Sequence, residues 1–183
     1  MFCAVIILML ISGCSSEAGK LVPDAFSAKD LCMEKTGFPD SEICYGTDRK
    51  RVERILGSGK GSGVVQKYDD GVSVMYREDK VAGLAIGFSL EKRMQITRGI
   101  RIGSKKEEVE QKYGKKYAIV TALGGTLYSF YKENNLPLER KAYKSERSDD
   151  EKQGVFEIWF SYDKAGGVNE IILSDQRMSA EKK

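Results

Sequence analysis

The sequence ICYGTDRKRVERILG (residues 43–57) is repeated without a gap as IRIGSKKEEVEQKYG (residues 100–114). Both copies fit the pattern I-x-[YI]-G-[ST]-x-x-x-x-V-E-x-x-x-G. The hydroxyl residue, Thr47 or Ser104, is expected to be a helix N-cap, because its oxygen can accept a hydrogen bond from an orphan backbone N–H group. The last glycine of each copy stands where helices commonly end. Each copy therefore predicts a helix of about ten residues.

Segments with the periodicity of strands follow each predicted helix. The clearest is 155–162, in which Phe156, Ile158, Phe160 and Tyr162 share one face. The predicted strands are 63–68, 72–76 and 81–88 after the first helix, and 118–123, 126–131, 155–162 and 168–173 after the second. The last strands of the two sets also match, as Val81-x-x-Leu84-x-Ile86 and Val168-x-x-Ile171-x-Leu173. An apolar helix stripe must be buried against a sheet, so the expected fold is α+β, with two tandem helix-plus-antiparallel-sheet repeats.

This pattern divides the body of the chain into two repeats, residues 23–90 and residues 91–175. The second repeat contains a strongly charged run, 132–153, which we expect to be a long exposed loop or the tip of an extended hairpin. The polar tail, 176–183, is expected to fray. Because one helix on one small sheet leaves little core, the two repeats should pack together, with their sheets either separate or continuous.

The N-terminal sequence indicates export. Residues 2–11 (FCAVIILMLI) are continuously apolar but too few to cross a bilayer core, which needs about 20 helical residues. They fit the apolar region of a signal peptide over residues 1–13, followed by a polar tether over 14–22. The stretch I-S-G-C, which ends at Cys14, resembles a bacterial lipobox. The resemblance implies that Cys14 carries a lipid and that the protein is anchored, on the extracytoplasmic side, to the cell membrane or the outer membrane. The alternative is a buried N-terminal segment with a chance cysteine.

Composition narrows the classes of function. The chain has 30 Lys and Arg, 27 Asp and Glu, and no histidine. A net charge of +3 that is spread along the chain does not indicate a nucleic-acid partner. Lack of histidine removes the commonest general base and zinc ligand, and with them Ser-His and Cys-His hydrolases. The acidic run 149–151 lacks the oxygen spacing of a calcium loop. We therefore expect no cofactor, no metal and no catalytic residues.

Two cysteines remain once Cys3 is removed with the signal peptide and Cys14 is lipidated. Cys32 and Cys44 form an even pair in an exported protein, so a disulfide between them is the natural hypothesis. Two free buried thiols are the alternative.

The repeated Gly-[ST]-x-x-x-x-Val-Glu-x-x-x-Gly helix, the aromatic strands and the Val-x-x-[IL]-x-[IL] last strand resemble the β-lactamase-inhibitor-protein-like fold. They are also similar to the small outer-membrane-assembly lipoproteins of the SmpA/OmlA (BamE) type. The resemblance covers roughly residues 43–175. It implies a module that holds other proteins on the free face of its sheet. No functional residue is transferred by it.

Four residues are candidates for such a binding face. Trp159 points away from Phe160, on the same side as Glu157, and exposed aromatic residues often anchor interfaces. The alternative is that Trp159 packs under the charged run or against the other repeat. Tyr128 and Tyr131 point in opposite directions along one strand, so one should be in the core and the other exposed. The expected function is a non-catalytic protein-binding or cell-envelope scaffold module. The alternative is an extracytoplasmic enzyme or small-ligand carrier that uses carboxylates between the repeats.

Overall fold

The computed structural model describes residues 21–61, 63–87, 93–142 and 147–180. The predicted signal peptide, Cys14 and most of the tether lie outside the described residues. The fold is α+β, with antiparallel sheets, as the sequence indicates. Among the described residues, no helix is long and apolar enough to cross a membrane.

The chain begins with a 3-10 turn, a hairpin and a helix, and then forms strands. The elements before residue 90 are η1 (Ala28–Leu31), β1 (Cys32–Lys35), β2 (Phe38–Cys44), α1 (Arg49–Leu56), β3 (Val65–Lys67), η2 (Asp69–Gly71), β4 (Val72–Arg77) and β5 (Lys80–Ile86). The elements after it are β6 (Met94–Ile96), α2 (Lys106–Tyr113), β7 (Ile119–Val120), β8 (Thr126–Tyr131), α3 (Asp149–Gln153), β9 (Val155–Tyr162), β10 (Val168–Asp175) and α4 (Gln176–Ala180).

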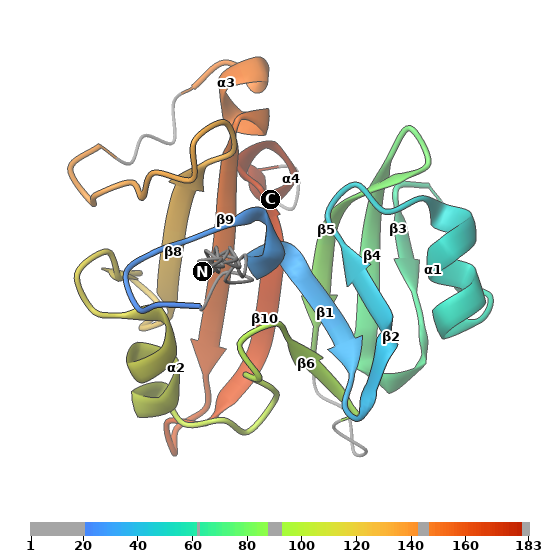
Figure 1. Cartoon of the computed structure of the whole chain (residues 1–183), viewed down its shortest axis with the longest axis horizontal. Helices are drawn as coiled ribbons and strands as arrows, with labels where there is room; N and C mark the ends of the chain where they lie inside the picture. Colours follow the sequence, from blue (N-terminus) through green and yellow to red (C-terminus); the bar gives the residue numbers. More distant parts are fainter. Residues whose placement is uncertain (1–20, 62, 88–92, 143–146, 181–183) are drawn as a thin grey trace, which may run out of the picture.

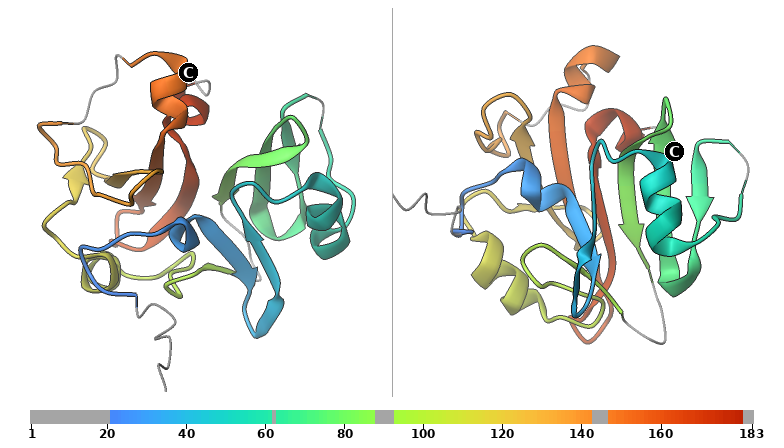
Figure 2. Two further views of the ribbon diagram at one scale, coloured as in Figure 1. Left: turned by 45° about the horizontal axis from the view of Figure 1, so that its top comes forward. Right: turned by 45° about the vertical axis from the view of Figure 1, so that its right-hand side comes forward.

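The described strands form two sheets. The large sheet has seven strands in the order β3-β4-β5-β10-β9-β8-β7, and the small sheet has three in the order β2-β1-β6. In Figure 1 the small sheet lies in front of the β4 and β5 part of the large sheet, with α1 beyond β3 at the right and α2 at the lower left, and Figure 2 shows the same elements from two further directions. All three contribute to one core on one side of the large sheet. We call this side the inner face of the large sheet and the opposite side its outer face.

The main core lies between the inner face and these covering elements. It contains Val74, Leu84, Ile158 and Leu173 of the large sheet, which stand in one transverse row. From the covering side, Val52 of α1, Val109 and Tyr113 of α2, and Met33 and Ile96 of the small sheet close on them, all buried. Burial of these side chains is the main source of the stability of the fold.

Strands β5 and β10 join the strands of residues 23–90, which we call the first half of the chain, to those of residues 91–175, which we call the second half. They are antiparallel, with Leu84 opposite Leu173, Ala85 opposite Ile172, and Ile86 opposite Ile171. The sequence did not decide whether the strands that follow the first predicted helix share a sheet with those that follow the second. The pairing of β5 with β10 shows that they do.

The predicted N-caps are wrong by one residue. Thr47 Oγ1 accepts a hydrogen bond from the N–H of Cys44 (3.0 Å), and Ser104 Oγ accepts one from the N–H of Arg101 (3.3 Å). Each hydroxyl therefore closes the turn before the helix and does not cap the helix itself. The N-cap positions are occupied by Asp48 and Lys105.

Two segments are more ordered than the sequence suggests. The charged run 132–153 is not a loop throughout, because α3 forms at its end, with Ser148 accepting a hydrogen bond from the N–H of Glu151. The tail does not fray at once, because α4 continues directly from β10. Met178 of α4 is 3 % exposed and packs on Met75 and Ala82, so α4 covers one end of the outer face.

Candidate binding surface

The outer face of the large sheet carries one transverse row of directly opposed residues that crosses all seven described strands. From β3 to β7, the row is Lys67, Ser73, Ala85, Ile172, Trp159, Leu127 and Ile119. Opposed residues of neighbouring strands point to the same side of a sheet. The rows on either side belong to the core, so this row must point outward. We call it the outer row.

The outer row is polar or small at one end and apolar at the other. Lys67 is exposed and Ser73 is half-buried, whereas Leu127 is buried beside a half-buried Trp159. A Cβ atom added to Gly125 would lie 3.1 Å from Trp159 Nε1, so the indole lies against the β7–β8 turn. The indole N–H makes no hydrogen bond to the part of the chain that the structure describes. A large apolar ring with an unused donor is typical of an interface anchor.

Two of the four candidate residues are buried, and their assignment to a binding face is wrong. Tyr128 is 0 % exposed in the main core, where its hydroxyl donates to the carbonyl of Gly114 (2.8 Å), and burial raises its pKa. It is the core member of the tyrosine pair. Glu157 is 4 % exposed. It stands in the next outer row, beside Ser174, at the end where α3 and α4 contact β9.

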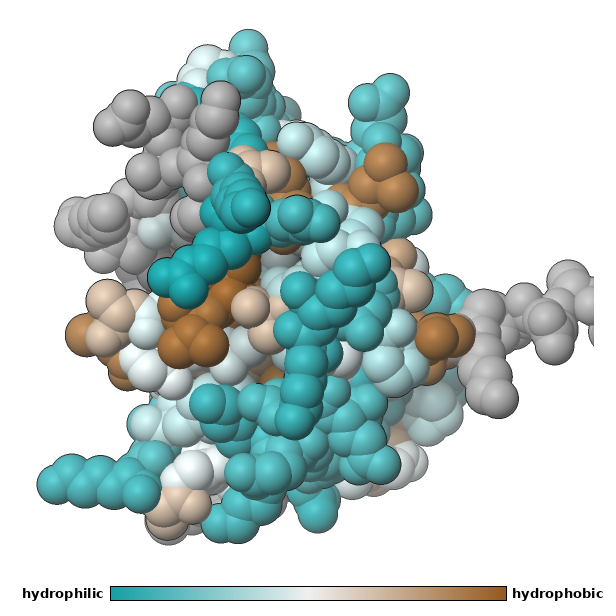
Figure 3. Space-filling view, turned by 90° about the vertical axis from the view of Figure 1, so that its left-hand side faces the viewer, coloured by the Kyte–Doolittle hydropathy of each residue, from teal (hydrophilic) through white to brown (hydrophobic). Residues whose placement is uncertain are grey.

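Tyr131 is the exposed member of the pair, at 39 %. It lines a cavity of about 570 Å³ together with Lys132, Glu133, Arg147 and Glu151. The side of the molecule with α2 and β8, shown in Figure 3, is mostly hydrophilic with apolar patches between. Exposed large apolar side chains of the second half are Val120, Leu123, Tyr131 and Leu136.

A buried ion pair ties the N-terminal segment to the second half. Arg98 Nε donates to Asp30 Oδ1 (2.6 Å) and Nη2 to Oδ2 (3.0 Å). The same guanidinium donates to the carbonyls of Val22, Ala25 and Lys112. Burial disfavours its charge, but the hydrogen bonds and charge of Asp30 outweigh this, so the pKa of Arg98 lies above its usual value. Sequence reasoning missed this pair, because nothing in the sequence connects positions 68 residues apart.

A second buried carboxylate holds the end of β10. Asp175 is 0 % exposed and accepts hydrogen bonds from Tyr45 Oη (2.7 Å), Arg77 Nη1 (2.8 Å) and the N–H of Met178 (2.9 Å). Burial and the bond to Asp175 raise the pKa of Tyr45 well above its usual value. Asp175 therefore fixes residues of the first half against the last strand of the second.

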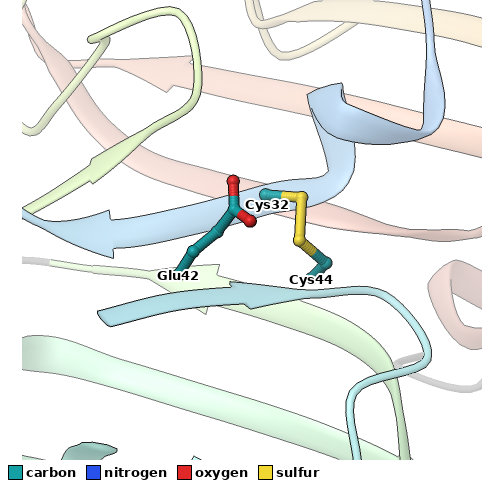
Figure 4. Close-up of side chains that lie close together, drawn as sticks. All are labelled: Cys32, Glu42 and Cys44. Carbon is teal, nitrogen blue, oxygen red and sulfur yellow. A yellow bond between two sulfur atoms is a disulfide. The ribbon is translucent and has the colours of Figure 1, made fainter. Parts of the chain in front are cut away.

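Cys32 and Cys44 form a disulfide between directly opposed residues of β1 and β2, as Figure 4 shows. With Glu42 they are the one group of potential metal ligands among the described residues. Both sulfur atoms are engaged in the disulfide, and the metal ligand of a cysteine is its thiolate. In this oxidised form the group does not offer a soft-metal site.

Comparisons with known proteins add no relative: no protein-family model, curated protein or solved structure matches this chain.

Proposed function

We propose that this chain is a lipid-anchored extracytoplasmic module, built from two tandem helix-plus-sheet repeats, that binds a protein partner and does no catalysis. The half-buried apolar residues of the outer row, Trp159 and Ile172, are the contact surface in this proposal. The lipobox-like I-S-G-C stretch supports the anchor, which would be in the cell membrane or the outer membrane. Two helices on one face of a single long antiparallel sheet support the resemblance to the β-lactamase-inhibitor-protein-like fold.

Support for duplication comes from the pairing of β5 with β10. In the repeated sequence Leu84 corresponds to Ile171, Ile86 to Leu173, and Ala85 to Ile172. Across the junction Leu84 faces Leu173 and Ile86 faces Ile171, while Ala85 faces its own counterpart. Reciprocal pairing of this kind is what a local two-fold axis between two copies of one unit generates.

Backbone details around the two helices also correspond. The N–H of Val81 donates to the carbonyl of Thr47 (2.9 Å), and the N–H of Val168 donates to that of Ser104 (2.8 Å). The last hairpin of each half, β4–β5 and β9–β10, also has a shift in strand register next to this valine. A cation lies over the equivalent tyrosine ring in each half, Arg49 over Tyr76 and Lys106 over Tyr162.

The proposed contact surface is supported mainly by one observation: the residues of the outer row differ in chemical character between the two halves. By the correspondence above and the strand registers, Lys67, Ser73 and Ala85 of the first half are equivalent to Leu127, Trp159 and Ile172 of the second. The inner-face residues that flank the outer row on β4, β5, β9 and β10 are apolar in both halves. Packing explains the inner face, but it does not demand an indole at a half-buried outer position, so a partner contact is the function we assign to it.

Site-specific photo-crosslinking on intact cells tests the surface. A benzophenone-bearing residue at position 159 should give a discrete crosslinked protein, whereas the same residue at position 73, the equivalent position of the other half, should not. Crosslinks from position 73 with none from position 159 would contradict the assignment. Growth with labelled palmitate tests the anchor separately: the wild-type chain should be labelled, and the Cys14→Ser variant should lose both the label and its sedimentation with membranes.

A further inference from the structure

We infer that a cavity at the seam between the two halves binds a phosphoryl oxyanion. This seam cavity has a volume of about 240 Å³. Its lining includes Tyr45, Arg77 and Lys80 from the first half and Lys132 and Gln153 from the second. The site is distinct from the outer row, and the inference does not depend on the proposed protein partner.

Arg77 is held in position at the cavity wall. Its guanidinium makes two hydrogen bonds to Asp175, at 2.8 and 3.3 Å, and its side chain is 21 % exposed. The hydroxyl of Tyr45 donates to Asp175 Oδ2, the oxygen that also accepts from Arg77 Nη1. Asp175 is fully buried, so it orients Arg77 without presenting its own negative charge at the surface. The guanidinium that Asp175 holds in place gives the cavity wall a fixed positive charge.

Lys80 adds a second positive charge directly opposite the first. Arg77 and Lys80 are paired across β4 and β5, and like charges at opposed positions destabilise a hairpin. The two residues of the connecting turn, Glu78 and Asp79, have φ values of 51° and 58°, a conformation that glycine and asparagine prefer. Repulsion and backbone strain therefore coincide at one turn, and strain of this kind concentrates at ligand sites.

Lys132 supplies a third positive charge from the second half. Its Nζ lies 5.3 Å from the ring centre of Tyr45, which places the ammonium beside the same cavity. Neither Lys80 nor Lys132 forms an ion pair within the described part of the chain. The site thus holds three cations against two carboxylates, Glu78 of the lining and the buried Asp175 that pairs with Arg77. The excess of one positive charge would attract an anion.

The equivalent turn of the other half has no such arrangement. Asp163 takes the place of Arg77, and Gly167 takes the place of Lys80. Asp163 accepts hydrogen bonds from the N–H groups of Ala165 (2.8 Å) and Gly167 (2.9 Å). The carboxylate of this turn is therefore hydrogen-bonded within the turn itself. The cluster of cations is therefore a feature of the seam and not of the repeated unit.

Calorimetric titration of the purified full-length chain with inorganic phosphate, at constant ionic strength in chloride, tests the inference. Wild-type protein should show saturable binding at one site. The double variant Lys80→Ala/Lys132→Gln, which leaves the Arg77–Asp175 pair intact, should bind at least tenfold more weakly. Lys164→Ala, an exposed lysine in the equivalent turn, is the matched control and should bind as wild type does. Urea unfolding in phosphate-free buffer should give the double variant a midpoint no lower than that of wild type.

Vesicle sedimentation separates the two sources of a phosphoryl group. Phosphatidylcholine vesicles with and without phosphatidic acid present or withhold a phosphomonoester headgroup. Binding to free phosphate alone assigns a soluble ligand, and binding that needs both phosphatidic acid and the two lysines assigns a lipid headgroup. The inference is overturned if neither probe binds above the chloride background, or if the folded double variant binds as tightly as wild type.

Discussion

The two helix C-caps provide a matched test of how the N-terminal segment packs. Gly57 and Gly114 end α1 and α2 with almost the same backbone conformation, φ 85° with ψ −169° and φ 87° with ψ 170°. In each, the N–H donates to the carbonyl of the residue four positions earlier, at 2.9 Å. Their surroundings differ. A Cβ atom at position 57 would meet nothing within 4 Å, whereas at position 114 it would lie 2.7 Å from the backbone nitrogen of Asp24 and closer still to its carboxylate.

The expected loss of stability has two parts: the strain of an alanine backbone in this conformation, and the steric overlap of the new Cβ atom with its neighbours. Alanine in this glycine-only conformation costs about 1–3 kcal/mol, and this cost is common to Gly57→Ala and Gly114→Ala. At position 114 the segment around Asp24 must also move. That movement breaks the hydrogen bond from the N–H of Asp24 to the carbonyl of Tyr113 (2.9 Å) and the bond from the N–H of Lys116 to Asp24 Oδ1 (3.0 Å). At about 1 kcal/mol each, Gly114→Ala should lose about 2 kcal/mol more than Gly57→Ala.

Urea unfolding measures the difference. The chain has one tryptophan, Trp159 on β9, so its fluorescence reports the large sheet, and far-ultraviolet circular dichroism reports the whole fold. A difference of about 2 kcal/mol should separate the two midpoints by about 1 M urea. Equal midpoints, or a lower one for Gly57→Ala, would show that Asp24 does not pack on the end of α2 as described.

Three further predictions concern the buried ion pair, the buried tyrosines and the disulfide. Asp30→Asn leaves the guanidinium of Arg98 buried without its counter-charge and should cost about 3–5 kcal/mol in urea unfolding, whereas Asp79→Asn, at an ion-pairing carboxylate whose side chain is 82 % exposed, should cost under about 1 kcal/mol. Because burial raises the pKa of Tyr128, the unfolded chain releases a proton above about pH 10 that the folded chain keeps, so stability should fall as pH rises through that range. Tyr128→Phe should make the fall shallower by up to about 1.4 kcal/mol per pH unit, measured by urea unfolding between pH 8 and 11, and an unchanged slope would contradict this. Reduction of the Cys32–Cys44 disulfide, which closes a loop with a sequence separation of 12, should lower the free energy of unfolding by about 3 kcal/mol, and a reduced chain as stable as the oxidised one would refute the estimate.

The elements that sequence could predict are those whose pattern is local. β8 and β9 have the predicted bounds. In β9, period-two alternation of large apolar side chains identifies the strand. In β8, an aromatic segment lies between a Gly-Gly turn and a charged run, and these two features mark its ends. Helices α1 and α2 were predicted, since the apolar stripe and final glycine of each lie within one short segment. The shift at Thr47 and Ser104 has a physical cause: a hydroxyl can serve the preceding turn as well as the helix, and composition does not distinguish the two.

The elements that sequence missed depend on distant contacts. β1 has only four residues and is ordered by β2 on one side and by β6 on the other, and β6 lies more than 50 residues away in the chain. The short helix α4 is below the length at which helices form alone, and it exists because Met178 finds an apolar site on Met75. For the candidate surface, alternation gave the directions of Trp159 and Glu157 correctly. It could not reveal that α3 and α4 contact β9 and that Glu157 is buried, whereas Trp159 is half-buried.

Packing constrains the residues of the inner face of the large sheet more than those of its outer face. Residues with a role in binding are therefore expected on the outer face. The inner-face residues of β4, β5, β9 and β10 that flank the outer row belong to the main core and are apolar on both sides of the β5–β10 junction. A change of their volume therefore costs stability in either half. On the outer face, the end under α4 is packed in a similar way, and Ala85, Leu127 and Ile119 of the outer row are also buried. Ser73 and Trp159 are equivalent, half-buried and outside the main core, and they differ between the halves. Stability does not require that difference, so a partner that contacts one half and not the other is the simplest reason for it.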